Sequence, residues 1–138
     1  MSTIVMVAGD FGHIHQGHVD HIVKAYSLGN YLIIVTHTDD SIRERKGYEP
    51  TPLWARIIIL KGLISLLGGE GEVMLALDTD GKCRKTLRKI KPDIFAKGGE
   101  YTLSTLPQEE ISVCEECGIR IIFGVGERLA QSRELADL

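Results

Sequence analysis

The sequence predicts a doubly wound α/β fold, with five parallel strands in one sheet and helices on both faces. Three observations predict it. Short apolar, β-branched segments alternate along the chain with longer segments that carry apolar residues at helical spacing. The connections between the apolar segments are long enough for the crossovers that parallel strands require. The chain has 138 residues, 43% of them hydrophobic, which suffices for one core.

Each expected strand is a short, continuous apolar run, the pattern of a strand that is buried on both faces. The expected strands are residues 3–8, 31–36, 73–77, 93–96 and 119–123. The expected helices are residues 17–28, 53–67, 83–90 and 107–117, with Gly or Pro near their ends. Because no repeat or linker interrupts this alternation, we predict a single domain over residues 1–138.

Composition excludes several classes of protein. The net charge is −3 with acidic and basic residues mixed, which argues against nucleic-acid binding. The apolar runs are too short to span a bilayer, and the N-terminus lacks the pattern of a signal peptide. We therefore expect a cytoplasmic protein with no membrane partner. Three cysteines do not suggest a disulfide framework, and Cys114 and Cys117 are interpreted as ordinary helix residues.

The loop after the first expected strand is the most informative segment. In doubly wound sheets, ligands bind at the carboxyl ends of the strands near the switch in strand order. Residues 9–18 combine a glycine-bearing turn with a helix start, where free amides and the helix dipole favour an anion. His15 and His18 flank Gly17, so two imidazoles can donate to phosphate oxygens while the glycine admits a bulky triphosphate. This pattern suits phosphoryl or nucleotidyl transfer, in which positioned donors stabilise charge on phosphate.

Residues 9–18, GDFGHIHQGH, resemble the G-[TV]-F-D-x-x-H-x-G-H signature of the cytidylyltransferase-like nucleotidyltransferase superfamily. LGNYLIIV at residues 28–35 is similar to the family's L-G-D-x-L-I-V-x-V, and PLWAR at residues 52–56 to its P-x-x-x-R. KPDIFAKGGEY at residues 91–101 is similar to x-P-D-x-x-V-K-G-G-D-Y of the heptose-1-phosphate adenylyltransferase branch. Glycerol-3-phosphate cytidylyltransferases form the neighbouring branch. The resemblance implies a Rossmann-like nucleotidyltransferase fold.

The resemblance also implies a reaction. A nucleoside monophosphate would pass from ATP or CTP to a phosphorylated small molecule, with Mg²⁺ as cofactor and pyrophosphate as the second product. A sugar 1-phosphate is the favoured acceptor, and glycerol 3-phosphate is the alternative. The sequence does not choose between ATP and CTP. Members of the family are often dimers, so a homodimer is expected.

The candidate site residues come from the loop motif and from the resemblance. Arg43, Arg45 and Lys46 follow the second expected strand in a polar stretch, interpreted as a mobile loop that could reach a triphosphate. The candidate catalytic residues are His15, His18, Lys46 and Arg56, with Lys46 and Arg56 holding the β- and γ-phosphates. The candidate nucleotide-binding residues are Gly9, Asp10, Phe11, Gly17, Lys97, Gly98, Gly99, Glu100, Ser132 and Arg133. No metal ligand is assigned.

Two departures from the family pattern leave alternatives open. Gly12 stands where the family has an aspartate, and an aspartate is found two positions earlier as Asp10. The family's serine run near the end is reduced to Ser132. A catalytically weak nucleotide-binding or sensing protein is therefore one alternative. Another is a zinc or nickel site, because four histidines fall within residues 13–21.

Overall fold

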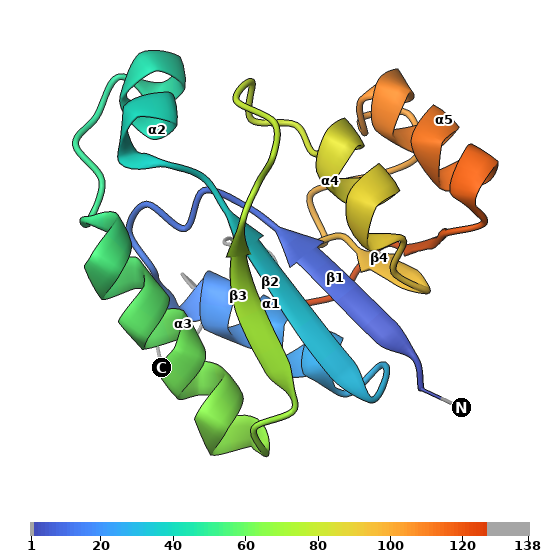
Figure 1. Ribbon diagram of the computed structural model, residues 1–138, viewed down its shortest axis with the longest axis horizontal. Helices are drawn as coiled ribbons and strands as arrows, with labels where there is room; N and C mark the ends of the chain where they lie inside the picture. The colour runs from blue at the N-terminus through green and yellow to red at the C-terminus, as the bar shows by residue number, and fades with distance from the viewer. Residues whose placement is uncertain (1, 127–138) are drawn as a thin grey trace, which may run out of the picture.

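In the computed structural model, which describes residues 2–126, five parallel strands form one sheet in the order β3-β2-β1-β4-β5. The strands are β1 (Ile4–Ala8), β2 (Tyr31–Thr36), β3 (Gly71–Leu75), β4 (Ile94–Ala96) and β5 (Arg120–Ile122). Their carboxyl ends gather at one end of the molecule (Figure 1). The predicted parallel five-stranded sheet is confirmed.

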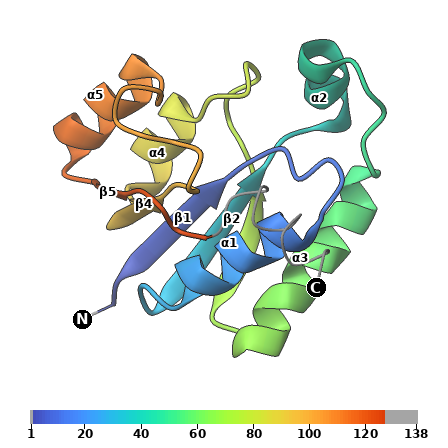
Figure 2. The ribbon, with the colours of Figure 1, turned by 180° about the vertical axis from the view of Figure 1, so that it is seen from behind.

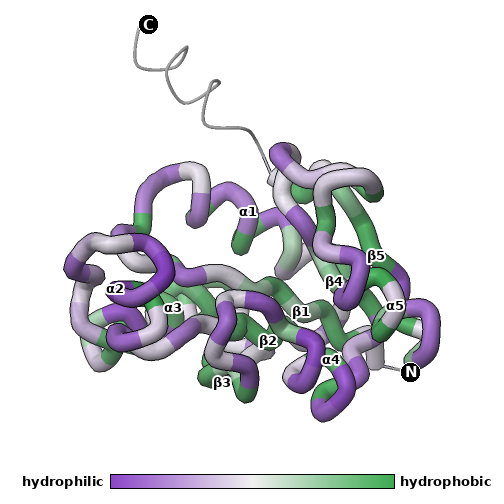
Figure 3. Tube along the Cα trace, turned by 90° about the horizontal axis from the view of Figure 1, so that it is seen from above, coloured by the Kyte–Doolittle hydropathy of each residue, from purple (hydrophilic) through white to green (hydrophobic). Residues whose placement is uncertain are grey.

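Helices cover both faces of the sheet, as the continuous apolar strands predict. The helices are α1 (Gln16–Tyr26), α2 (Asp39–Lys46), α3 (Leu53–Leu67), α4 (Arg84–Ile90) and α5 (Gln108–Cys117). Val5 and Val7 of β1 belong to the core beneath α1 and α3, whereas Met6 belongs to the core beneath α4 and α5. Successive strand residues point to opposite faces, so both faces need apolar side chains. Figures 2 and 3 show α1 on one side of the strands and α4 on the other.

The third strand begins two residues earlier than predicted. Gly71 pairs with Leu32, and the strand ends at Leu75 opposite Thr36, the last residue of β2. A Cβ at position 71 would overlap the carbonyl oxygen of Leu32, so this strand start requires glycine. A pattern of apolar residues does not reveal such a start, because glycine is depleted in strands.

Helix α2 was not predicted, and the polar stretch expected to be a mobile loop is helical. It carries few apolar residues, so it shows no apolar stripe. Its boundaries are set by caps instead: the Thr38 side chain accepts from the Ser41 amide, and Gly47 ends the helix in the left-handed region with φ 75°. Cations in its last turn complement the helix dipole.

The strand order reverses between β1 and β4. From β1 the chain proceeds outward through β2 to β3, and then returns to the other side of β1 with β4 and β5. The loops after β1 and β4 therefore diverge at their carboxyl ends and leave a crevice, the usual position of a ligand in such sheets. Across residues 2–126, every helix is too short or too polar to traverse a membrane.

Candidate active site

A cleft of about 440 Å³ opens at the switch in strand order, beside the carboxyl ends of β1 and β4. The loop after β1, the start of α1, the end of α2 and the turn after β4 line it. The candidate residues that line this cleft are Gly9, Asp10, Phe11, His15, His18, Lys46, Lys97, Gly98 and Glu100. Gly17, Arg56 and Gly99 lie outside its lining. The structure thus brings together most of the residues that the sequence singled out.

His15 and His18 form a reciprocal capping pair at the start of α1. The Nδ1 of His15 accepts from the Gly17 amide at 3.1 Å, and the Nδ1 of His18 accepts from the His15 amide at 3.3 Å. A neutral imidazole whose Nδ1 accepts carries its proton on Nε2. Both rings line the cleft, so each keeps an Nε2–H donor for a ligand at the positive end of a helix. The Gly17 amide, by contrast, is already engaged.

The two rings are stacked, with centroids 3.9 Å apart and an angle of 26° between their planes. Burial, together with the neighbouring His15 and His21, lowers the pKa of His18 to about 4. His18 is therefore neutral at pH 7 in the free protein. His21 follows one turn later, and its Nδ1 donates to the carbonyl of Val125, which ties α1 to the segment after β5. Burial lowers the pKa of His21 as well.

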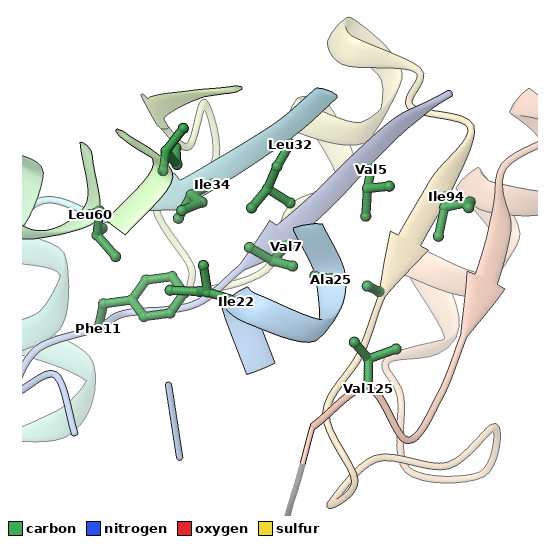
Figure 4. Packing of buried hydrophobic residues seen from close by; sticks show 12 residues of the cluster. Val5, Val7, Phe11, Ile22, Ala25, Leu32, Ile34, Leu60, Ile94 and Val125 are labelled. Carbon is green, nitrogen blue, oxygen red and sulfur yellow. The ribbon is translucent and has the colours of Figure 1, made fainter. Parts of the chain in front are cut away.

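Phe11 anchors the loop after β1 to the core. It is buried, with a positive φ of 49°, and its ring packs beside Ile22 and Leu60 (Figure 4). The same ring meets His18 edge-on, with centroids 5.2 Å apart. A Cβ at Gly9 would lie 3.3 Å from the Phe11 ring, so glycine lets the ring fold back over the strand end. Phe11 therefore fixes the position of His18.

Gly12, which stands where the family has an aspartate, is covered by Tyr48. A Cβ at position 12 would overlap the Tyr48 hydroxyl. The ring of Tyr48 also packs against His13, with centroids 5.2 Å apart, and both line the cleft. The loop between α2 and α3 therefore occupies the space that a larger side chain at position 12 would need.

Asp10 is held by Arg45 of α2. The Arg45 guanidinium donates to both carboxylate oxygens of Asp10, at 2.7 and 3.3 Å, and to the Ser41 hydroxyl at 3.0 Å. Both side chains are largely buried. A bidentate guanidinium–carboxylate pair is geometrically specific. This pair joins the loop after β1 to a helix 35 residues further along the chain.

Arg56 was expected to reach phosphate, but the structure places it beneath the loops. It is fully buried, and each of its guanidinium nitrogens is engaged. Its partners are the carbonyls of Asp10 and Thr51, the Thr36 hydroxyl and the Asp39 carboxylate. The ion pair with Asp39 measures 2.5 Å. In this arrangement Arg56 positions the loop after β1 and the start of α2.

The remaining cations of α2 differ in their availability. Arg43 is exposed and paired with Glu49, at 2.6 and 2.8 Å, and with Asp40 at 2.7 Å. It does not line the cleft. Lys46 lies at the end of the helix, lines the cleft and makes no ion pair with any residue in the described part of the chain.

The turn after β4 contributes a second buried cation. Lys97 is 7% exposed, and its ammonium lies 4.1 Å from the ring centroid of Tyr101 and 5.0 Å from that of Phe95. No carboxylate within residues 2–126 forms an ion pair with it. A buried ammonium over aromatic faces is well placed to meet an anion. Gly98 and Glu100 follow and also line the cleft.

A smaller cavity of about 250 Å³ adjoins the cleft. The two share Ala8, Gly9, Asp10, Lys46, Lys97 and Tyr101. The smaller cavity extends away from the histidine pair, toward the start of α4 and α5, and is lined there by Lys82, Cys83, Thr105 and Glu110. A ligand in the cleft and a ligand in the smaller cavity would therefore both lie beside Asp10 and Lys97.

A model of the cytidylyltransferase-like family matches residues 6–125. The chain belongs to the cytidylyltransferase-like family. This cytidylyltransferase-like chain is 37% identical over 101 residues to the bifunctional protein HldE of Actinobacillus succinogenes, covering 71% of the chain and 20% of that protein. It is 35% identical over 116 residues to HldE of Haemophilus ducreyi, covering 82% and 22%. The chain spans about a fifth of the length of these relatives.

Solved structures support the same assignment. The lipopolysaccharide core biosynthesis protein of Thermoplasma volcanium is 26% identical to this cytidylyltransferase-like chain, with a TM-score of 0.68. The match covers 93% of the chain and 100% of that structure. A protein of unknown function from Archaeoglobus fulgidus is 25% identical with a TM-score of 0.66, and the match covers 88% of each.

The structure does not test every prediction about the site of this cytidylyltransferase-like chain. Ser132 and Arg133 lie outside the described residues. Within residues 2–126, no three His, Cys, Asp or Glu side chains converge to hold a metal ion, so the zinc or nickel reading of the histidines gains no support. Tyr48 and Tyr101 line the cleft but were not among the predicted site residues. Tyr101 directly follows the KGGE turn and could have been found from it, whereas nothing in the sequence pairs Tyr48 with Gly12.

Proposed function

We propose that this protein is a nucleotidyltransferase that transfers AMP or CMP to a phosphorylated small molecule and releases pyrophosphate. One observation carries the proposal. Two imidazoles with their Nε2–H donors free line a cleft at a helix N-terminus and at the switch in strand order. Donors held in this way stabilise charge that develops on phosphate without reorganising during the reaction.

In the proposed reaction, a phosphate oxygen of the acceptor attacks the α-phosphorus of the triphosphate. The new P–O bond forms as the bond from the α-phosphorus to the bridging oxygen of the β-phosphate breaks, and pyrophosphate leaves in line. The attacking phosphate is already an anion, so no side chain needs to remove its proton. The protein contributes orientation and charge stabilisation. His15 and His18 would donate to the oxygens of the transferring phosphate and the leaving group.

The cations divide into two groups by their contacts. Lys46 and Lys97 line the cleft, and neither is paired with a carboxylate in the described residues, so we assign to them the contacts with the phosphates. Arg45 and Arg56 are engaged with protein groups, so we assign to them the positioning of the loop after β1. This replaces the expected contact between Arg56 and the β- and γ-phosphates.

Mg²⁺ fits the site as an ion held mainly by the triphosphate and water, which is its usual mode of binding. Of the described residues, two carboxylates line the cleft, those of Asp10 and Glu100. Arg45 engages Asp10, whereas Glu100 forms no ion pair within residues 2–126. When bound, the ion would neutralise charge on the phosphates. Glu100 is the side chain that would face it, because both carboxylate oxygens of Asp10 accept from Arg45.

The nucleoside would lie against the turn at residues 97–100, where Gly98 allows close approach and Glu100 can accept from a ribose hydroxyl. Either ATP or CTP satisfies these contacts. The acceptor would occupy the smaller cavity, on the other side of Asp10 and Lys97. A sugar 1-phosphate is the favoured acceptor because residues 91–101 resemble the heptose-1-phosphate branch, and glycerol 3-phosphate is the second choice.

Pyrophosphate release tests the proposal. The chain is incubated with Mg²⁺ and either ATP or CTP, against a panel of sugar 1-phosphates, glycerol 3-phosphate and other phosphate esters. We expect release that requires one triphosphate and one acceptor together. Triphosphate binding without release for any acceptor would instead favour a nucleotide-sensing protein. Two contacts favour that alternative: Tyr48 covers Gly12, and Arg45 holds Asp10.

We also propose a homodimer. Helix α3 is apolar on nearly all sides, and Trp54, Ile58 and Leu66 are 70%, 62% and 86% exposed. A helix that is apolar all round is normally covered. Light scattering coupled to gel filtration is expected to give twice the mass of the chain, and Ile58→Glu is expected to give a monomer. A monomeric wild-type protein at micromolar concentration would contradict the dimer.

A further inference from the structure

The smaller cavity contains a buried carboxylate that the proposed mechanism does not use. Glu110, in the first turn of α5, is 4% exposed and lines the cavity. Its Oε2 accepts from the Cys83 amide at 2.9 Å and from the Cys83 thiol at 3.0 Å. Its Oε1 accepts no hydrogen bond from any residue in the range 2–126. This oxygen is accessible from the cavity, because within residues 2–126 the fully buried side-chain atoms that lack a partner are His37 Nδ1 and Arg84 Nε. A hydroxyl of a ligand in the cavity can therefore donate to it.

The nearby cations do not satisfy Glu110. Lys82 is paired with Glu109 at 3.4 Å, Arg45 is paired with Asp10, and Lys97 lies over Tyr101. The thiol of Cys83 donates to Glu110, and burial followed by the charge of Glu110 raises the pKa of that thiol. Cys83 therefore stays protonated and holds Oε2 in place, so the other oxygen of Glu110 has a fixed position.

The charges around the cavity decide what kind of donor fits. Arg45, Lys46, Lys82 and Lys97 line it together with the carboxylates of Asp10 and Glu110. Positive charge is therefore in excess, which disfavours a ligand that carries a cationic amine. The same cations attract a phosphate group. A ligand that combines a phosphate with a neutral hydroxyl donor satisfies the cations and the Glu110 oxygen together.

We propose that Glu110 is a specificity residue: its Oε1 accepts a hydrogen bond from a hydroxyl group of the acceptor and selects phosphate esters of polyhydroxylated compounds. This inference rests on the proposed function, because it places the acceptor in the smaller cavity. Glu110 takes no part in the transfer itself. It distinguishes an acceptor with a hydroxyl at this position from one without, because a site built to pair a hydroxyl is left unsatisfied by an analogue that lacks it.

A purely structural role for Glu110 is the competing explanation, since the carboxylate links α5 to the start of α4. Glu110→Gln separates the two. The glutamine oxygen can still accept from the Cys83 amide, whereas the atom that replaces Oε1 becomes a donor. Glu109→Gln is the matched control: it makes the same change one residue away, on a side chain that is 49% exposed and does not line the cavity.

The experiment compares the wild type, Glu110→Gln and Glu109→Gln with glucose 1-phosphate, mannose 1-phosphate, glycerol 3-phosphate and ethyl phosphate. For the best hydroxyl-bearing acceptor, Glu110→Gln is expected to raise KM roughly 10-fold, because the hydroxyl loses its charged acceptor and can only accept a neutral hydrogen bond from the glutamine amide instead. The KM for the triphosphate, and turnover of ethyl phosphate, are expected to stay within about twofold of wild type. Glu109→Gln is expected to behave as wild type.

An unchanged preference for the hydroxyl-bearing acceptor in Glu110→Gln would overturn the inference and leave the proposed function standing. An equal loss with ethyl phosphate would also overturn it, because that result indicates a structural role. If the wild type releases no pyrophosphate, the proposed function fails instead, and calorimetric binding of the same probes decides about Glu110. Tighter binding of a sugar phosphate than of ethyl phosphate, lost in Glu110→Gln, would support the inference. Equal binding, or no binding, would overturn it.

Discussion

The histidine pair at the start of α1 and the arginine pair beneath the loop after β1 are organised in opposite ways. His15 and His18 are oriented by amides within three residues of themselves, and they keep a donor free. Arg45 and Arg56 reach across 35 and 46 residues to Asp10, and their guanidinium groups are engaged with the protein. Local chain geometry thus orients the groups proposed to bind phosphate, and long-range contacts hold that geometry in place.

The largest expected effect comes from His18→Ala. Removal of a positioned donor to the transferring phosphate is expected to lower kcat by roughly 10²- to 10³-fold. The melting temperature is expected to fall by only a few degrees, because the variant loses one half of the capping pair at the start of α1, a loss of about 1 kcal/mol. Steady-state kinetics and thermal unfolding measure the two quantities. His13→Ala is the control, since His13 lines the same cleft but does not cap the helix. An equal loss of kcat in both variants would show that His18 acts only as part of the cleft lining and not as a hydrogen-bond donor.

Whereas His18→Ala mainly lowers kcat, Arg56→Ala is expected to lower the stability of the fold. It leaves the Asp39 carboxylate and three oxygen acceptors without their partner, which is expected to cost about 3–5 kcal/mol of unfolding free energy. Urea unfolding measures that loss. If stability stays near wild type while the KM for the triphosphate rises sharply, Arg56 contacts phosphate after all. That result would contradict its assignment as a positioning residue.

Arg45→Gln is expected to have a smaller effect, because the loop after β1 keeps its anchor at Phe11. Release of Asp10 shifts the loop, and a small misplacement is expected to lower kcat/KM roughly 10-fold. Arg43→Gln serves as the control, because Arg43 makes its contacts outside the cleft. Equal activities of the two variants would show that the Asp10–Arg45 pair does not position the loop.

The smallest expected effect concerns pH. The pKa of His18 is lowered from 6.5 to about 4 by burial and the adjacent imidazoles. Between these values the unfolded chain binds more protons than the folded chain, so stability falls as the pH drops from 6.5 toward 4. His18→Gln is expected to lose less stability than wild type between pH 7 and pH 5 in urea unfolding. His21 and His37, whose pKa values burial also lowers, contribute equally in both proteins. Identical pH dependence would contradict the lowered pKa.

The same contrast explains what the sequence could predict. The sheet and the histidine loop depend on short-range patterns: continuous apolar strands, a glycine turn and two histidines flanking Gly17. Whether Arg56 contacts phosphate or is buried among protein groups depends on which residues surround it after folding. Its position in the sequence does not predict this. Helix α2 was missed because it has no apolar stripe, although Thr38 and Gly47 did mark its ends. The contact of Tyr48 with Gly12 has no counterpart in any local pattern.

In the proposed reaction, the α-phosphorus of a triphosphate is transferred to the acceptor. Its most direct test is to supply the chain, Mg²⁺ and the acceptor panel with ATP or CTP labelled at either the α- or the γ-phosphorus. Nucleotidyl transfer is expected to place the α-label in the acceptor product and the γ-label in pyrophosphate. Transfer of the γ-label to the acceptor, or retention of both labels in the triphosphate with every acceptor, would contradict it.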